Sequence, residues 1–497
     1  MRHVASLVIL SSLGGCSLLY NPSNIDKQMD APPPPDARLA DVNPALLELT
    51  AVKSPPLLEG QGTSNSVPAI LVITGHQMLP EARVTLEPTT ANPNVTLTLG
   101  TTVVAIDGDW IAVPVTAGIM MNVNDGTTVA LTATVTQPGA PAKTIGWSLQ
   151  GLDQIKSAVD VTIMASHPRP YSQVDLTGSL IFKGSTPESR GLVRTMGLLK
   201  ITGSVTAVTD LAPAVSAAVA GGCPGGAGGT VGGCSAPTAG GPASGTAGGG
   251  GGGFDGNGGA TTAMNHGIGG SGTGEASVKK FSTNLGGGGG GGGGGVTGGG
   301  EGGATGGAVE LSAGGDMMIG AVTMNGTPGA APPVASLGGG GGGGAGGLII
   351  VRAKGTTFAT GAVSAAGGGG GGATTGLGGN GAHGRIRFDT QTSTVPVGST
   401  PVPHRGLMIT PIAQPLTRLK KPAITITGSV NDTYDLYIVN PDDANAKTST
   451  NNTLTQASSM VSTPELSIGH NTICVLPTGA TLNEIEAKNC IELAYLP

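Results

Sequence analysis

Aromatic and charged side chains are scarce in this chain of 497 residues. Phe, Trp and Tyr make up 2% of the sequence and charged residues 11%, whereas glycine occurs 91 times. So few aromatic and long charged side chains argue against a helical bundle and against a large α/β enzyme. The net charge of −6 gives no electrostatic case for binding nucleic acid, which requires basic patches.

Long apolar runs are also missing. After position 16, no stretch approaches the ~20 apolar residues that a membrane-spanning helix requires. The chain begins with Met1-Arg2-His3 and a short apolar stretch at 4–10, which is the layout of a secretory signal peptide. The segment Leu13-Gly14-Gly15-Cys16 follows and resembles the lipobox of bacterial lipoproteins.

That resemblance implies that residues 1–15 are a signal peptide and that the Cys16 thiol carries a diacylglyceryl group. Several acyl chains at the new N-terminus would make a stable membrane anchor. Ser17 stands where an inner-membrane retention signal of such families typically has Asp, so the resemblance favours the outer membrane, facing the periplasm or the cell surface. Residues 16–44 are rich in proline, which predicts an extended tether.

The chain has only five cysteines. Cys16 is assigned to the lipid, which leaves the pair Cys223 and Cys234 and the pair Cys474 and Cys490. In an oxidising compartment each pair is expected to form a structural disulfide. Metal binding is the weaker alternative, because no CxxC or nearby His supplies ligand spacing. We therefore expect no metal and no cofactor.

Residues 45–154 contain short segments rich in Val, Ile, Thr and Leu, separated by turn signals. Apolar and polar residues alternate at 95–99 and 129–135, so each segment presents one apolar face. Several short strands at this spacing predict a β-sandwich. The stretch Ile70-Leu71-Val72-Ile73-Thr74-Gly75 resembles the strand and turn of IPT/TIG-type immunoglobulin-like domains, which implies a spacer or a binding module.

Residues 159–390 have the pattern of a parallel β-helix. Segments 306–313 and 346–353 align at an offset of 40, and 384–388 is a partial third copy. Repeats of this kind stack so that neighbours bury a shared column of side chains. The alignment predicts one column of Val309, Ile349 and Ile386, a second of Leu311, Val351 and Phe388, and Glu310, Ile350 and Arg387 facing the other way. The pattern resembles the Gly-rich repeat proteins of bacterial surfaces.

Runs of glycine interrupt these repeats at 248–253, 286–295, 338–344 and 367–372. Polyglycine loses much conformational entropy on ordering and has no side chain to bury, so flexible loops are the first expectation. The alternative is a bundle of extended polyglycine helices, as in a few Gly-rich cold-protection and adhesive proteins. Only glycine permits such close approach of backbones.

Residues 403–497 again predict strands, at 423–428 and 434–439, and a second small β-sandwich. Segments 473–475 and 490–493 are expected to be strands joined by a Cys474–Cys490 bridge.

Catalytic patterns are missing: there is no GxSxG elbow, no HExxH helix and no phosphate loop ending in GK[ST]. A carbohydrate-active enzyme on the β-helix would need carboxylates that converge on one face. The acids of the region are dispersed, at Asp255, Glu275, Glu301, Glu310, Asp316 and Asp389. The histidines are dispersed too and are expected to be solvated or in turns, at His76, His167, His266, His383 and His470.

The sequence thus predicts a mainly-β, non-enzymatic protein anchored by lipid on Cys16. It is expected to have a structural or adhesive role toward envelope glycan or a surface matrix, with no nucleic-acid partner. Two alternatives stay open: a carbohydrate-active enzyme on the β-helix, and a polyglycine-bundle protein that binds ice or forms fibres.

Overall fold

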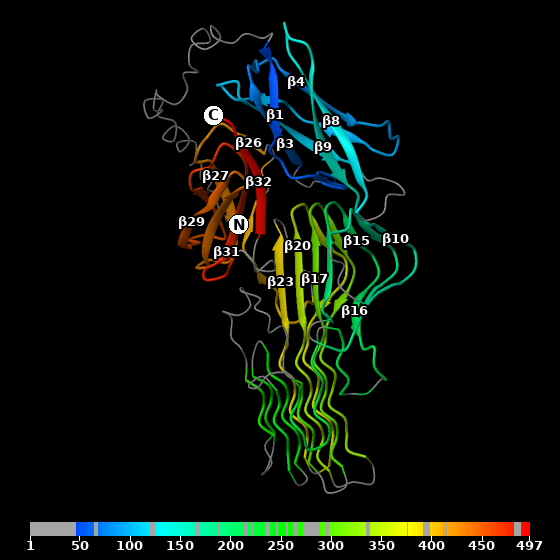
Figure 1. The fold of residues 1–497 in the computed structure, drawn as a ribbon. Coiled ribbons are helices and arrows are strands. Elements are labelled where there is room, and N and C mark those ends of the chain that lie inside the picture. The colour runs from blue at the N-terminus through cyan, green and yellow to red at the C-terminus, as the bar shows by residue number, and fades with distance from the viewer. Residues whose placement is uncertain are drawn as a thin grey trace, which may run out of the picture. The chain divides into compact units, whose positions relative to one another are not determined.

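The computed structural model describes most of the chain from residue 46 onward, with the backbone alone at 444–447. The described residues are 46–63, 68–118, 126–164, 169–186, 189–212, 214, 216–220, 222–233, 239–244, 247–254, 257–261, 267–271, 289–294, 298–333, 338–374, 376–390, 398–410, 412, 415–481 and 489–497. Over these ranges β-strands dominate and no α-helix occurs, so the predicted mainly-β class is confirmed (Figure 1). No helix there is long and apolar enough to cross a membrane.

The first folded part is a pair of sheets. One has the strand order β1-β3-β7-β5 with β6 beside β7, and the other has the order β2-β9-β8-β4. Alternation along the strands works as predicted: in β8, Leu131, Ala133 and Val135 are buried and face a core shared with the opposite sheet. The strands are β1 (Glu48–Val52), β2 (Leu57–Leu58), β3 (Ala69–His76), β4 (Arg83–Pro88), β5 (Leu97–Leu99), β6 (Val103–Val104), β7 (Trp110–Ala117), β8 (Thr128–Thr136) and β9 (Lys143–Gln150).

The middle part is a solenoid of three parallel sheets, with orders β10-β12-β15-β18-β21, β11-β13-β16-β19-β22 and β14-β17-β20-β23-β24. Each turn of the chain contributes a strand to successive sheets, as in a parallel β-helix. The strands are β10 (Ile155–Ser157), β11 (Val161–Ile163), β12 (Val174–Leu176), β13 (Leu180–Lys183), β14 (Gly191–Thr195), β15 (Leu199–Ile201), β16 (Val205–Val208), β17 (Ala308–Ala313), β18 (Met317–Ile319), β19 (Val322–Thr323), β20 (Leu348–Ala353), β21 (Thr357–Ala359), β22 (Val363–Ser364), β23 (Arg385–Thr390) and β24 (His404–Arg405).

The predicted aliphatic columns are confirmed by the register of the third sheet. Val309 pairs with Ile349, and Ile349 pairs with Ile386. The second column follows the same register, with Leu311, Val351 and Phe388. All of these side chains lie in the one core that the three sheets enclose, so stacking of neighbouring coils holds the solenoid together.

The glycine-rich segments leave the solenoid at one corner. In three successive coils the chain departs after a strand of the second sheet and returns to a strand of the third: from β16 to β17, from β19 to β20 and from β22 to β23. Figure 1 shows the described segments side by side as extended traces beyond β17, β20 and β23. The glycine-rich segments therefore stack on one another as the coils do.

Residues 338–347 show how these segments are held. Gly340 donates to Gly376 O at 2.9 Å and Gly343 donates to Gly379 O at 2.8 Å, so the same neighbour is contacted at every third residue. A repeat of three is that of a polyproline II-type helix. The intervening N–H groups reach two other segments: Gly339 and Gly342 donate to Gly294 and Gly291, and Gly341 and Gly344 donate to Ala330 and Thr327.

The carbonyl groups of the same run are satisfied by three further segments, through donors at Gly249 and Gly252, at Gly300, Gly303 and Gly306, and at Gly368 and Gly371. Residues 338–347 are buried throughout. A Cβ on Gly341 would overlap the carbonyl oxygen of Glu301, and one on Gly342 would overlap that of Gly250. The described glycine segments thus form a hydrogen-bonded polyglycine bundle. The expectation of flexible loops is wrong for them, because inter-segment hydrogen bonds and close packing offset the entropy of ordering glycine.

The last part again pairs two sheets, with orders β25-β27-β30 and β26-β32-β31-β28-β29, over a core that includes Ile426, Leu436 and Ile473. The strands are β25 (Met408–Ile409), β26 (Leu416–Thr417), β27 (Ala423–Thr427), β28 (Thr433–Asn440), β29 (Asp443–Thr453), β30 (Ser458–Ser462), β31 (Gly469–Pro477) and β32 (Asn489–Tyr495). Cys474 and Cys490 are register partners in β31 and β32 and form the predicted disulfide.

Candidate functional site

The outward face of the third solenoid sheet carries a row of charged side chains. Register places Arg194 beside Ser312, Ser312 beside Arg352, and Arg352 beside Asp389. A second row lies two residues earlier along the same strands. In it Glu310 is beside Ile350, and Ile350 is beside Arg387. Because successive residues of a strand face opposite sides, these groups lie opposite the aliphatic columns. The predicted outward direction of Glu310 and Arg387 is thereby confirmed.

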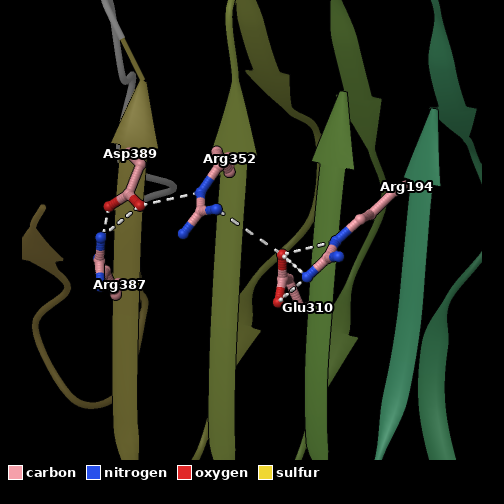
Figure 2. A network of polar contacts seen from close by, with 5 residues as sticks. All are labelled: Arg194, Glu310, Arg352, Arg387 and Asp389. Atoms are coloured by element: carbon pink, nitrogen blue, oxygen red, sulfur yellow. Dashed lines mark hydrogen bonds and ion pairs between the residues drawn. The ribbon is translucent and has the colours of Figure 1, made fainter. Parts of the chain in front are cut away.

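These side chains form a continuous ladder of ion pairs (Figure 2). Arg194 Nη2 lies 3.2 Å from Glu310 Oε1, and Arg352 Nη1 lies 3.9 Å from the same oxygen. Arg352 Nε donates to Asp389 Oδ2 at 3.2 Å. Arg387 holds the same carboxylate through Nε and Nη2, each at 2.6 Å from an oxygen of Asp389. Each carboxylate thus bridges two guanidinium groups.

Four of the five ladder residues are buried although the ladder faces away from the solenoid core, and Arg194 is partly exposed. Glu310 is 2% exposed, Asp389 is 0% exposed and Arg387 is 1% exposed. Burial lowers the pKa of the Arg387 guanidinium, and the adjacent Asp389 carboxylate acts against that shift. The five residues comprise three guanidinium groups and two carboxylates.

A cavity of about 280 Å³ opens beside the ladder. Its polar lining includes Arg194, Ser312, Arg352, Lys354 and Asn489. Burial lowers the pKa of the Lys354 ammonium, Glu492 acts in the opposite direction and Arg352 adds to the lowering. Strand β32 contributes Asn489 and Cys490, so the cavity combines residues of the solenoid with two of the last sheet.

The other acids predicted as dispersed stay apart where the structure describes them. Glu301 accepts a hydrogen bond from Ser216 Oγ at 3.0 Å, and Asp316 accepts one from Thr356 N at 2.8 Å. Asp255 and Glu275 lie outside the described residues. Over the described ranges, no group of three or more His, Cys, Asp and Glu side chains could hold a metal ion.

One of the histidines departs from expectation. His76 is exposed and lies 3.0 Å from Asp109, as a solvated residue would. His470 was expected in a solvated or turn position, and this is wrong. It is 4% exposed within β31, with Nε2 at 3.6 Å from Glu492 Oε2. It is buried because it lies on the face of β31 and β32 that the first pair of sheets covers, where its register partner Ala494 packs with Ile70 and Val72. His383 is exposed beside Gly367, whereas His167 and His266 lie outside the described residues.

The lipidation residue Cys16 lies outside the described residues, and so does Cys234. Cys223 is buried and takes part in a disulfide. Its N–H donates to Thr305 Oγ1 at 2.6 Å, which fixes its position against the segment that leads into β17.

Comparison with known proteins gives little. No family model matches the chain, and no curated protein matches it. A solved structure described as "ZirS C-terminal Domain" is similar at 11% sequence identity, over 30% of this chain and 96% of that chain, with a TM-score of 0.16. A likeness this weak carries no argument about fold or function.

Proposed function

We propose that this chain is a lipid-anchored, non-enzymatic protein of the outer membrane, facing the periplasm or the cell surface, with a structural or adhesive role toward glycan or matrix. The observation that carries the proposal is the polyglycine bundle that leaves one corner of the solenoid. In its central run, residues 339–344, each N–H and C=O is taken up by neighbouring segments and there are no side chains. Such an element suits a stiff spacer or support better than a reaction centre.

The charge ladder supports the same proposal. A glycoside-cleaving enzyme requires one carboxyl group to donate a proton and another to act as base or nucleophile. Glu310 and Asp389 instead lie between guanidinium groups and are buried. They serve as counter-ions that join β14, β17, β20 and β23.

The test is membrane fractionation together with protease treatment of intact cells. The anchored chain should fractionate with the outer membrane, and Cys16→Ser should abolish its labelling by radioactive palmitate. Ser17→Asp should move the chain to the inner membrane, while the matched variant Ser17→Ala should leave it in place. Soluble wild-type protein, or fractionation unchanged by Cys16→Ser, would refute the anchor. Protease treatment then distinguishes a chain on the cell surface from one enclosed in the periplasm.

The bundle also favours a second candidate, an ice-binding or fibre-forming protein. Its outward positions recur at every third residue, as at Leu377, Asn380 and His383, all exposed. These three side chains differ in chemistry, whereas recognition of a crystal lattice calls for one kind of group at a regular spacing. Measurement of thermal hysteresis with the purified chain decides the matter: a freezing point depressed below that of an equimolar inert protein would establish ice binding.

A further inference from the structure

Another cavity lies where the first pair of sheets meets the last pair. It has a volume of about 460 Å³, and its walls include residues of β6 and β7 on one side and of β26 on the other. Most of its lining is apolar, with Pro68, Val103, Pro114, Pro415 and Leu416. Pockets for small molecules typically have ~300–1,000 Å³ and an apolar lining with few polar groups, so this cavity has the build of a ligand site.

The apolar lining continues a covered face of the first sheets. Ala112 of β7 belongs to the apolar cluster that joins the two pairs of sheets, together with Ile70 and Ala494. Pro114 lies on the same face of β7, two residues further along, but it is only partly buried. Apolar surface thus extends past the edge of the junction into the cavity, where an apolar ligand would remove it from water.

One cation and two hydroxyl groups complete the chemistry of the lining. The cation is Arg418, and no acidic residue occurs among the described residues that line the cavity. Its guanidinium donates from Nη2 to Val104 O at 2.9 Å and from Nη1 to Pro497 O at 3.2 Å. These contacts hold the group in place and use two of its five N–H donors. The other N–H donors and the hydroxyls of Thr101 and Thr417 suit an anionic oxygen.

We propose that this cavity binds a long-chain carboxylate, a fatty acid, with its acyl chain against the proline-rich lining and its carboxylate on the Arg418 guanidinium. Charge complementarity selects the head, because the wall carries a cation and no acid. Volume selects the tail: at ~30 Å³ for a group the size of a water molecule, the cavity takes one acyl chain of roughly a dozen carbons. The proposal goes beyond the adhesive role and does not depend on it.

Other classes of ligand fit this lining less well. A sugar would bring hydroxyl groups against proline rings, which cannot hydrogen-bond with them. A small anion such as acetate would meet Arg418 but would leave the apolar wall in contact with water. A fatty alcohol would cover that wall without a charge for the guanidinium. A long-chain carboxylate carries both the charge and the apolar tail.

Calorimetric titration of the full chain with Cys16→Ser tests the proposal. That chain has no thiol to carry an acyl anchor, so no detergent is required that would compete for the cavity. Decanoate, decanol and acetate are the separate probes. Decanoate should bind saturably, and decanol ~10-fold or more weakly because it lacks the charge-assisted hydrogen bonds. Acetate should give no saturable heat, since it buries hardly any apolar surface.

Three substitutions in that chain locate the ligand. Arg418→Met should weaken decanoate by ~10-fold and leave decanol unchanged, because it removes the charge and keeps an apolar side chain. Thr101→Trp places a large side chain at an exposed position of the wall and should weaken both probes by ~10-fold or more. Arg83→Met is the matched control. Arg83 also donates to two backbone carbonyls, those of Glu81 and Ala82, but does not line the cavity, so both probes should bind as before.

The proposal is overturned if decanoate gives no saturable heat, or if decanol binds as tightly as decanoate does. It is also overturned if Arg83→Met weakens decanoate as much as Arg418→Met does, or if Thr101→Trp changes neither probe, because the ligand would then lie elsewhere.

Arg418 also contacts two backbone carbonyls, so a variant that keeps its charge separates binding from folding. Arg418→Lys should bind decanoate more tightly than Arg418→Met, and circular dichroism shows whether each variant is folded. Equal binding by two folded variants would contradict the assigned role of the cation. Fractionation and protease treatment are independent of these titrations, so a failed ligand does not remove the proposed surface role.

Discussion

The guanidinium Nε of Arg352 lies 3.2 Å from Asp389 Oδ2, across the register pair that joins β20 to β23. Asp389 is at the same time held by Arg387, which lies two residues before it on β23. A single buried carboxylate thus neutralises one cation on its own strand and one on the neighbouring strand. Loss of its charge should remove a close counter-ion from both guanidinium groups in a poorly solvated place.

We therefore expect Asp389→Asn to lower the free energy of unfolding by about 3–5 kcal/mol. The amide keeps the shape of the side chain, so the loss reports charge rather than packing. Urea denaturation is the appropriate measurement, because urea is uncharged and does not screen the ion pairs.

Asp442→Asn is the control for that variant. Asp442 pairs with Lys53 at 2.7 Å, but both side chains are at least one-third exposed, so its loss should change stability by less than about 1 kcal/mol. Equal effects of the two substitutions would contradict the view that burial gives the ladder its importance.

The aliphatic column gives a second prediction. Ile349 is fully buried between Val309 and Ile386, and Ile349→Ala should destabilise the chain by about 2–5 kcal/mol, because it removes apolar contacts and leaves a cavity. Phe358→Ala is the control in the same coil. Phe358 is 54% exposed, and its loss should change the free energy of unfolding by about 0.5 kcal/mol or less. A small effect at Ile349 would mean that the column does not hold the coils together.

The columns could be predicted because they leave a local signal. Alternation fixes which residues face inward, and the offset of 40 fixes which ones stack. The same alignment places Arg352 over Asp389, so the central ion pair of the ladder could be predicted from opposite charges in one row. The pair between Arg194 and Glu310 could not be predicted, since 116 residues separate them and no repeat unit was aligned over β14.

The polyglycine bundle could not be predicted from the sequence in the same way. A run such as 338–344 has no register of its own, because each glycine is the same as the next. What selects the bundle over a loop is a set of hydrogen bonds to segments distant in sequence, such as Gly249 to Gly340. One signal was available: the runs recur between aligned repeats, which places them at equivalent positions of successive coils.

Protonation of His76 gives a third prediction. A hydrogen bond to Asp109 is the main cause that raises the pKa of this exposed imidazole above 6.5, with the Asp109 charge next and a smaller contribution from Glu48. The stabilising pair is therefore fully present below pH 6.5 and is lost as the pH rises through the raised pKa. Titration of the His76 ring protons by NMR should show that elevated pKa.

Two substitutions separate the causes at His76. Asp109→Asn should return its pKa toward 6.5, whereas Glu48→Gln should lower it by less. An unchanged titration in Asp109→Asn would show that the pair does not form in solution.

The polyglycine bundle gives a fourth prediction, in which two glycines should respond differently to the same added methyl group. Neither Gly342 nor Gly369 has a positive φ, so alanine is compatible with the backbone at both positions. At Gly342 the new Cβ would overlap the carbonyl oxygen of Gly250, whereas at Gly369 it would meet nothing within 4 Å. Gly342→Ala should therefore destabilise the chain by about 1–3 kcal/mol through overpacking.

Gly369→Ala should instead be neutral or stabilising by about 0.4–1 kcal/mol, because alanine restricts the unfolded chain without a clash in the folded one. Urea denaturation gives the two stabilities, and amide hydrogen exchange locates the change. Protection should fall at the segments that contact Gly342, among them Gly291 and Gly303. If both alanine variants were equally stable and equally protected, the glycine segments would not be packed against one another, and the spacer role built on them would fail.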